Sequence, residues 1–164
     1  MKCSRAIFIT SLIIVSINTA NAARYDDSKA GFTASIGSAQ IRTNDFKDAN
    51  AAILGLAYTY YKGLRLQATI TSQTDMTSSN TRYHNTSGSF QATSIGLGYE
   101  FNDGFYVGGG ATQVRIKNLT TTESNSGYTA NIGYVASNGF DISIQTQHID
   151  YGSALSLSIG YKFL

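Results

Sequence analysis

The sequence contains no proline, no tryptophan and only one cysteine in 164 residues. Cys3 lies in an N-terminal segment that we expect to be removed, so the mature chain has no thiol chemistry and no disulfide. Tyrosine, threonine, serine and glycine are abundant, and this composition without proline favours strands joined by turns. The composition therefore predicts an all-β protein.

Long apolar runs are also scarce. The apolar stretch Ala6–Ile17 is about a dozen residues long, whereas a helix needs roughly 20 residues to cross a bilayer. Two basic residues precede this stretch and Ala20-Asn21-Ala22 follows it, which is the arrangement of a secretory signal peptide and its cleavage site. We predict a signal peptide at residues 1–22 and one mature domain at residues 23–164.

An excess of charge of one sign is missing from the mature chain. The signal peptide carries two of the twelve basic residues and none of the ten acidic ones, so the mature protein is formally neutral. A formally neutral chain gives no indication of the basic surface that nucleic-acid binding requires, so we expect no nucleic-acid partner. No later stretch is apolar enough for a membrane helix, so only strands could carry this chain across a bilayer.

Apolar and polar residues alternate along the mature chain, most clearly in the segment Leu155–Phe163. Successive side chains of a strand face opposite ways, so one face can meet lipid while the other meets a polar interior. A soluble lipocalin would need an apolar interior instead. The pattern predicts strands at residues 31–41, 51–60, 64–74, 89–101, 105–117, 127–136, 140–149 and 153–163. The predicted fold is an all-β, eight-stranded antiparallel up-and-down transmembrane β-barrel.

The predicted connections alternate between two kinds. Tight turns are expected at residues 61–63, 102–104 and 137–139, and longer polar loops at residues 42–50, 75–88 and 118–126. In bacterial outer-membrane barrels the short turns face the periplasm and the long loops face the exterior. The connection after residue 149 is an exception because it is short.

Aromatic residues are concentrated near the short turns, and amphipathic rings favour the level of the lipid headgroups. The predicted girdle consists of Tyr58, Tyr60, Tyr61, Tyr99, Phe101, Phe105, Tyr106, Tyr134, Phe140, Tyr161 and Phe163. A sparser set near the longer loops consists of Phe46, Tyr83, Phe90, Tyr128 and Tyr151.

Four charged residues fall on the inward face near the short-turn end: Arg65, Glu100, Asp141 and Lys162. The interior of an eight-stranded barrel is just wide enough to be filled by side chains, and buried charges have to be paired. We predict one ion network that plugs the barrel, with a gated ion path or proton relay as the alternative. Inward glycines at positions 96, 98, 133 and 160 are expected to make room for the arginine and lysine side chains, and the phase through residues 108–110 stays open.

The longer loops carry exposed aromatic and cationic residues, namely Phe46, Arg82, Tyr83 and His84. Loops on a rigid scaffold commonly carry recognition, so these four are the candidates for contact with a host or surface ligand. His148 could activate Ser153 with help from Asp150, but strand alternation puts His148 on the lipid-facing side. No metal-ligand spacing or cofactor motif accompanies these residues. We predict that the chain is not an enzyme and uses no cofactor, with a membrane-embedded hydrolase or acyltransferase as the weakest interpretation.

The strand pattern and the terminal segment Ser158–Phe163 resemble the small eight-stranded outer-membrane barrels of the OmpX, Ail and Lom family. The likeness extends more loosely to the OmpA membrane domain and opacity-type surface antigens. The terminal segment is similar to the signal read by the barrel-assembly machinery, although Leu164 follows the usual terminal aromatic. The resemblance implies the outer membrane of a Gram-negative bacterium, with lipid, lipopolysaccharide and that machinery as partners. It also implies a non-enzymatic role in envelope integrity or adhesion-like interaction through the loops, with a narrow channel for small solutes as the alternative.

Overall fold

The computed structural model describes residues 29–43, 47–77, 87–117, 122–149 and 152–163. The predicted signal peptide lies outside the described residues, so its cleavage after Ala22 stays a prediction. The elements are β1 (Gly31–Thr43), β2 (Ala49–Thr59), the 3-10 turn η2 (Tyr61–Gly63), β3 (Leu64–Thr71), β4 (Thr74–Thr77), β5 (Ser87–Glu100), β6 (Phe105–Lys117), β7 (Thr122–Val135), β8 (Phe140–Ile149) and β9 (Gly152–Phe163). Among the described residues, no helix is long and apolar enough to cross a membrane.

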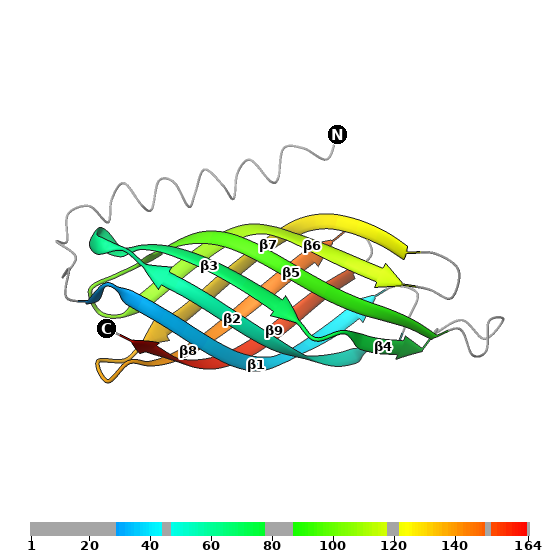
Figure 1. Cartoon of the computed structure of the whole chain (residues 1–164), viewed down its shortest axis with the longest axis horizontal. Helices are drawn as coiled ribbons and strands as arrows, with labels where there is room; N and C mark the ends of the chain where they lie inside the picture. The colour runs from blue at the N-terminus through cyan, green and yellow to red at the C-terminus, as the bar shows by residue number, and fades with distance from the viewer. Residues whose placement is uncertain (1–28, 44–46, 78–86, 118–121, 150–151, 164) are drawn as a thin grey trace.

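The strands form one antiparallel sheet that closes on itself (Figure 1). The first and last strands pair, with Phe32 opposite Phe163, and β3 pairs with β5, with Leu64 opposite Tyr99. β3 and β4 occupy one position in the barrel because both pair with β5. The predicted eight-stranded antiparallel barrel is therefore confirmed.

Only β6 and β8 have the predicted bounds, and the largest differences are in β3, β4 and β7. The predicted strand 64–74 is interrupted after Thr71, and β4 lies in what the sequence pattern indicated as a loop. β7 begins at Thr122 rather than at Gly127, because it pairs with β6 as far as Lys117. The outward side chains of β4 and of the first residues of β7 are polar. These segments therefore lack the alternation of apolar and polar residues that indicates a strand elsewhere in the chain.

The three short turns lie at the end of the barrel that holds the C-terminus (Figure 1). In each turn the glycine has a positive φ, at 80° for Gly63, 90° for Gly104 and 86° for Gly139, a region that side chains disfavour. The amides of Gly104 and Gly139 donate to the carbonyls of Phe101 and Ala136, both at 2.9 Å. The predicted tight turns at residues 61–63, 102–104 and 137–139 are thus confirmed.

The outer surface of the barrel is apolar around its middle. Large side chains that are more than half exposed include Ile36, Leu54, Leu56, Ile95, Leu97, Leu155 and Leu157. Their neighbours in sequence point inward, and many of these are polar or small, as with buried Ser94, Ser156 and Ser158. The predicted assignment of the apolar face to the outside is therefore correct, and this apolar belt is the surface that meets lipid.

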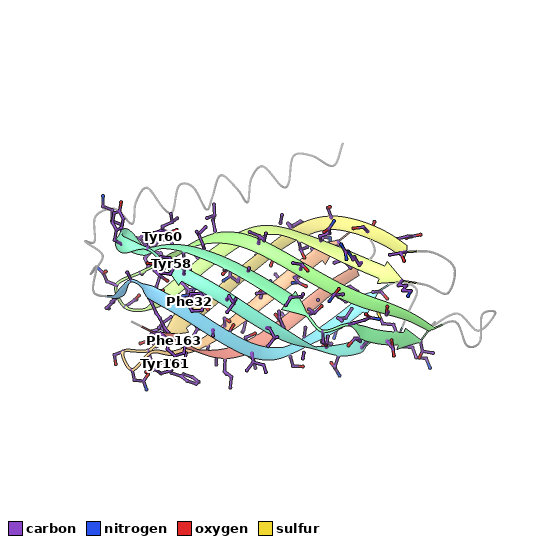
Figure 2. All side chains as sticks on the ribbon, in the orientation of Figure 1. Phe32, Tyr58, Tyr60, Tyr161 and Phe163 are labelled. Atoms are coloured by element: carbon purple, nitrogen blue, oxygen red, sulfur yellow. The ribbon has the colours of Figure 1, made fainter. Side chains whose placement is uncertain are left out.

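Most of the predicted girdle lies outside the barrel near the short turns, as the labelled rings of Tyr58, Tyr60, Tyr161 and Phe163 illustrate (Figure 2). Phe32, which the sequence pattern did not assign to the girdle, joins them. Two assignments were wrong: Tyr106 and Phe90 are each only 2% exposed. Both belong to the inward phase of their strands, with Glu100 in register with Tyr106 and Phe90 in register with Ile116.

We predict that the membrane depth of a residue sets the cost of a charge on the outer face. Leu157→Arg near the middle of β9 should lower the free energy of unfolding by about 2 to 4 kcal/mol, because it places a cation at the bilayer midplane. Gln40→Arg, on the outward face near the far end of β1, should cost at most about 1 kcal/mol. Reversible urea unfolding in lipid vesicles would measure both, and equal costs would show that the depth assignment is wrong.

Candidate functional site

The structure brings the four predicted interior charges together inside the short-turn end of the barrel. Arg65 Nη1 lies 3.1 Å from Glu100 Oε2, and Arg65 Nη2 lies 3.2 Å from Asp141 Oδ2. Lys162 Nζ lies 2.6 Å from Glu100 Oε1. All four side chains are buried, so the two cations and two carboxylates form one neutral network shielded from solvent.

Hydroxyl groups complete this network. Thr59 donates to Glu100 Oε2 at 2.8 Å, and the Tyr106 hydroxyl donates to Asp141 Oδ1 at 3.2 Å. The guanidinium carbon of Arg65 lies 4.1 Å from the centre of the Tyr106 ring, a cation–π contact. Sequence reasoning missed Tyr106 because it assigned the ring to the girdle. The signal that could have found it is the phase of β6, which the glycine run at residues 108–110 left open.

That phase is now resolved, because β6 pairs with β5 and β7 one residue to one residue, without a bulge. Gly108 is in register with Gly98 and with Asn131, and Gly110 with Gly96. Tyr106, Thr112 and Val114 are buried accordingly on the inward face.

The inward glycines make room for residues other than those predicted. A Cβ on Gly133 would lie 2.4 Å from Tyr106 Cζ, so Gly133 accommodates the tyrosine ring. A Cβ on Gly108 would lie 2.5 Å from Asn131 Oδ1, and one on Gly96 would lie 3.1 Å from Gln67 Nε2. We expected these glycines to make room for the arginine and lysine side chains. Instead, they make room for the Tyr106 ring and for the amides of Gln67 and Asn131.

This amide pair belongs to a polar layer in the middle of the barrel. Gln67 Nε2 donates to Asn131 Oδ1 at 2.7 Å, and Asn131 Nδ2 donates back to Gln67 Oε1 at 2.8 Å. Gln145 donates to the hydroxyls of Thr129 and Thr69 at 2.9 and 3.1 Å. These bonds satisfy polar groups that would be costly if buried alone, so the layer is a filled part of the interior.

An apolar layer fills the interior on the long-connection side. It consists of Ile41, Ala51, Met76, Phe90, Ala92, Val114, Ile116, Ile149 and Ala154. Sequence reasoning predicted no such layer, because these residues lie near polar loops and Phe90 was assigned to the interface. Their inward phase is visible only once the register of the strands is known.

One cavity lies between the network and the polar layer. Its volume is about 30 Å³, and residues such as Thr33, Arg65, Gln67, Asp141 and Ser158 line it. A water molecule needs roughly 10 to 15 Å³ by the same measure, so this cavity has room for about two. Arg65 Nε, a buried donor with no protein partner among the described residues, is available to such a water.

The remaining predicted residues do not gather into a site. Phe46, Arg82, Tyr83 and His84 lie outside the described residues, so their role as a contact surface stays a prediction. His148 is on the lipid-facing side as predicted, in register with Ser153 and with its ring 5.0 Å from that of Tyr128. Among the described residues, no acidic side chain contacts His148.

Solved structures provide neighbours for this fold. OprG of Pseudomonas aeruginosa aligns with a TM-score of 0.65 and 11% identity, over 86% of this chain and 99% of OprG. Ail, the attachment invasion locus protein of Yersinia pestis, in complex with the heparin analogue sucrose octasulfate, aligns with a TM-score of 0.58 and 19% identity, over 82% of this chain and 99% of Ail. Neisserial surface protein A aligns with a TM-score of 0.54 and 15% identity, over 81% of this chain and 97% of that protein.

No protein-family model matches the sequence, and no curated protein matches it. At the identities above, the likeness establishes the fold alone. The chain is an outer-membrane β-barrel by fold, which confirms the predicted resemblance to the small eight-stranded barrels and agrees with the predicted location.

We predict that Arg65 and Glu100 contribute non-additively to stability. Arg65→Met or Glu100→Gln alone should lower the free energy of unfolding by about 3 to 5 kcal/mol, because each change leaves a buried charge without its partner. The double variant should lose less than the sum by at least about 1 kcal/mol. Arg65→Met combined with Ser94→Ala, which lies in another layer, should be additive in the same unfolding titration. Additive losses for Arg65 and Glu100 would contradict their coupling.

We also predict that Gly133 is required by the Tyr106 ring. Gly133→Ala should lower the free energy of unfolding by about 1 to 3 kcal/mol through overpacking. In a Tyr106→Val background, where the ring is absent, the same change should cost clearly less. Guanidinium unfolding of the four proteins in this cycle measures the difference, and an unchanged cost in the valine background would show that another contact is responsible.

Proposed function

We propose that this protein is a non-enzymatic outer-membrane surface barrel that acts through its exterior and its loops, in envelope integrity or in adhesion-like interaction. The observation that carries the proposal is the filled interior. The network around Arg65 occupies the short-turn end, and the apolar layer around Phe90 occupies the other end. A solute that crossed the barrel would have to displace both layers.

The two layers resist displacement for different physical reasons. Separating Arg65 from Glu100 and Asp141 leaves charges in a low-dielectric interior, at a typical cost of about 3 to 5 kcal/mol. Admitting water to the apolar layer exposes buried Ile41, Phe90 and Val114, and each such side chain gains about 1.5 to 3 kcal/mol from burial. Function through the pore therefore requires more rearrangement than function through the loops.

A narrow channel for small solutes is the second candidate. The cavity of about 30 Å³ beside Arg65 and the hydrogen-bonded layer above it are the observations that favour this candidate. Rearrangement of the same charges could connect the cavity to the periplasmic end. An enzymatic role has less support, because His148 and Ser153 face lipid. Asp150, the acidic residue considered with them, lies outside the described residues.

We predict that the barrel binds its partner through the loops and conducts poorly. Replacing residues 44–46 and 78–86 with Gly/Ser sequence should abolish binding to any host matrix protein that binds the wild type. The replacement should leave the denaturant midpoint of unfolding unchanged. In planar bilayers the wild type should show no steady conductance, because both interior layers are closed. Surface plasmon resonance and single-channel recording are the measurements.

The interior variant Arg65→Met is the matched control for the loops. It should keep the binding of the wild type, since it changes nothing exposed. Steady wild-type conductance that disappears in Arg65→Met, or binding that survives both loop replacements, would favour the channel instead.

A further inference from the structure

The turn η2, between β2 and β3, carries an exposed cation beside an exposed aromatic ring. Lys62 Nζ lies 5.7 Å from the centre of the Tyr61 ring, and both side chains are exposed. We call these two residues the turn tip. Tyr61 is 62% exposed, more than any other aromatic residue that the structure describes. The turn tip therefore offers an apolar ring face and a positive charge to the surroundings of the barrel.

The backbone of the turn tip is strained. Lys62 has a φ of 65° and a ψ of 15°, and among the described residues it is the only one other than glycine with a positive φ. A β-carbon disfavours this left-handed region, which glycine, asparagine and aspartate adopt far more readily. Strain of this kind persists where the surrounding structure holds it, and it is concentrated at sites where the side chain is used.

The other two short turns close without this strain. Asp103 Oδ1 accepts a hydrogen bond from the backbone amide of Phe105 at 3.1 Å. Asn138 Oδ1 accepts one from the backbone amide of Phe140, also at 3.1 Å. Neither Asp103 nor Asn138 has a positive φ. A turn of this length therefore requires neither a tyrosine nor a lysine, so the use of the turn tip lies outside the fold.

The turn tip extends beyond the aromatic girdle. Tyr58 and Tyr60 belong to the girdle and pack edge to face, with ring centres 4.7 Å apart (Figure 2). Tyr61 lies three residues beyond Tyr58 and forms no ring pair among the described residues. At about 3.4 Å per residue and a strand tilt of about 40°, this separation is roughly 8 Å along the bilayer normal. Since the headgroup region is about 5 to 8 Å thick on each side, the turn tip reaches its periplasmic edge.

The charge and the ring of the turn tip together define the chemistry of a partner. Lys62 forms no ion pair among the described residues. An ammonium group suits a carboxylate, and an aromatic ring suits an apolar face of similar size. Peptidoglycan, the polymer that faces the outer membrane in the periplasm, combines both. Its pyranose rings present C–H faces, and its stem peptides carry carboxylates.

We propose that the turn tip binds peptidoglycan. The Tyr61 ring stacks on a sugar ring of the glycan strand, and the Lys62 ammonium group pairs with a carboxylate of a stem peptide. The inference rests on the proposed function and deepens its envelope-integrity role, because it names a partner at the end of the barrel opposite to the long loops.

The first measurement is cosedimentation with purified peptidoglycan sacculi of barrels held in zwitterionic phospholipid nanodiscs. Tyr61→Ser and Lys62→Gln should each weaken binding about five-fold, the size typical of an exposed ring contact or ion pair. Lys62→Arg keeps the charge, and Tyr134→Ser removes another exposed tyrosine near the same end. Both controls should stay within about two-fold of the wild type. Equal losses for Tyr61→Ser and Tyr134→Ser would overturn the proposal.

Chemically altered sacculi test the two contacts separately. Amidation of the stem-peptide carboxylates should weaken wild-type binding about five-fold and should abolish the difference between the wild type and Lys62→Gln. Tyr61→Ser should still lose about five-fold on amidated sacculi, because the glycan strand is unchanged. Wild-type binding that does not respond to amidation would contradict the proposal.

Lys62→Asn separates binding from folding. It should weaken binding to sacculi as Lys62→Gln does, but it should raise the equilibrium constant for folding about five-fold, because asparagine tolerates the left-handed region. Phospholipid headgroups are the competing partner. If Lys62 served them instead, Lys62→Asn would destabilise the barrel in anionic nanodiscs and leave sacculus binding unchanged, and that result would refute the proposal.

The loop-replaced barrel distinguishes this proposal from the preceding one. It should bind sacculi like the wild type, because the turn tip lies at the other end of the barrel. Loss of host-protein binding with sacculus binding intact supports both proposals. Sacculus binding that is unchanged in the Tyr61 and Lys62 variants would refute the turn tip alone, whereas host-protein binding that survives loop replacement would refute only the loop function.

Discussion

The pairing of buried charges around Arg65 is the constraint on which the rest of the interior depends. Its guanidinium on β3 contacts side chains from five other strands: Thr33 on β1, Thr59 on β2, Glu100 on β5, Tyr106 on β6 and Asp141 on β8. Lys162 on β9 joins through Glu100, and Gly133 on β7 leaves the space that the tyrosine ring needs. Every position around the barrel therefore contributes to one layer. A change in the register of β3, β5, β8 or β9 would leave a buried charge unpaired, so the network also specifies the register of these strands.

The layers above the network follow from the same narrow interior. An eight-stranded barrel has room for side chains but not for a wide channel. Each layer of its interior is filled by side chains of a different chemical kind. The middle layer uses reciprocal hydrogen bonds such as that between Gln67 and Asn131, and glycines in β5 and β6 give those amides space. The far layer uses apolar side chains around Phe90. Because side chains fill the interior, the surfaces that remain for recognition are the outer wall and the loops.

The outer wall is itself asymmetric. Around the middle it is predominantly apolar, as lipid requires, but β5, β6 and β7 extend beyond this belt while β8 and β9 do not. Their extension presents Arg115 and Lys117, which form no ion pair among the described residues, whereas Arg42 on the opposite wall is paired with Asp48.

The sequence by itself determined the architecture and most of the ionic layer. Period-two alternation defines strands and their two faces, so the outward position of Leu157 and the inward position of Arg65, Glu100, Asp141 and Lys162 could be predicted. Alternation carries this information because lipid on one side and a filled interior on the other impose opposite polarity on successive residues. The tight turns could be predicted as well, because Gly63, Gly104 and Gly139 adopt a φ that other residues disfavour.

Only the tertiary structure decided the partners. The contact of Tyr106 with Arg65 depends on strand phase and register, and so does the apolar layer around Phe90. An aromatic residue near a turn does not reveal its phase, because aromatic rings are favourable both at the membrane interface and in the interior. The extension of β7 back to Thr122 was equally hidden, since polar residues outside the lipid no longer alternate with apolar ones. Pairing with a neighbouring strand, rather than local pattern, makes those residues a strand and brings distant charges to one layer.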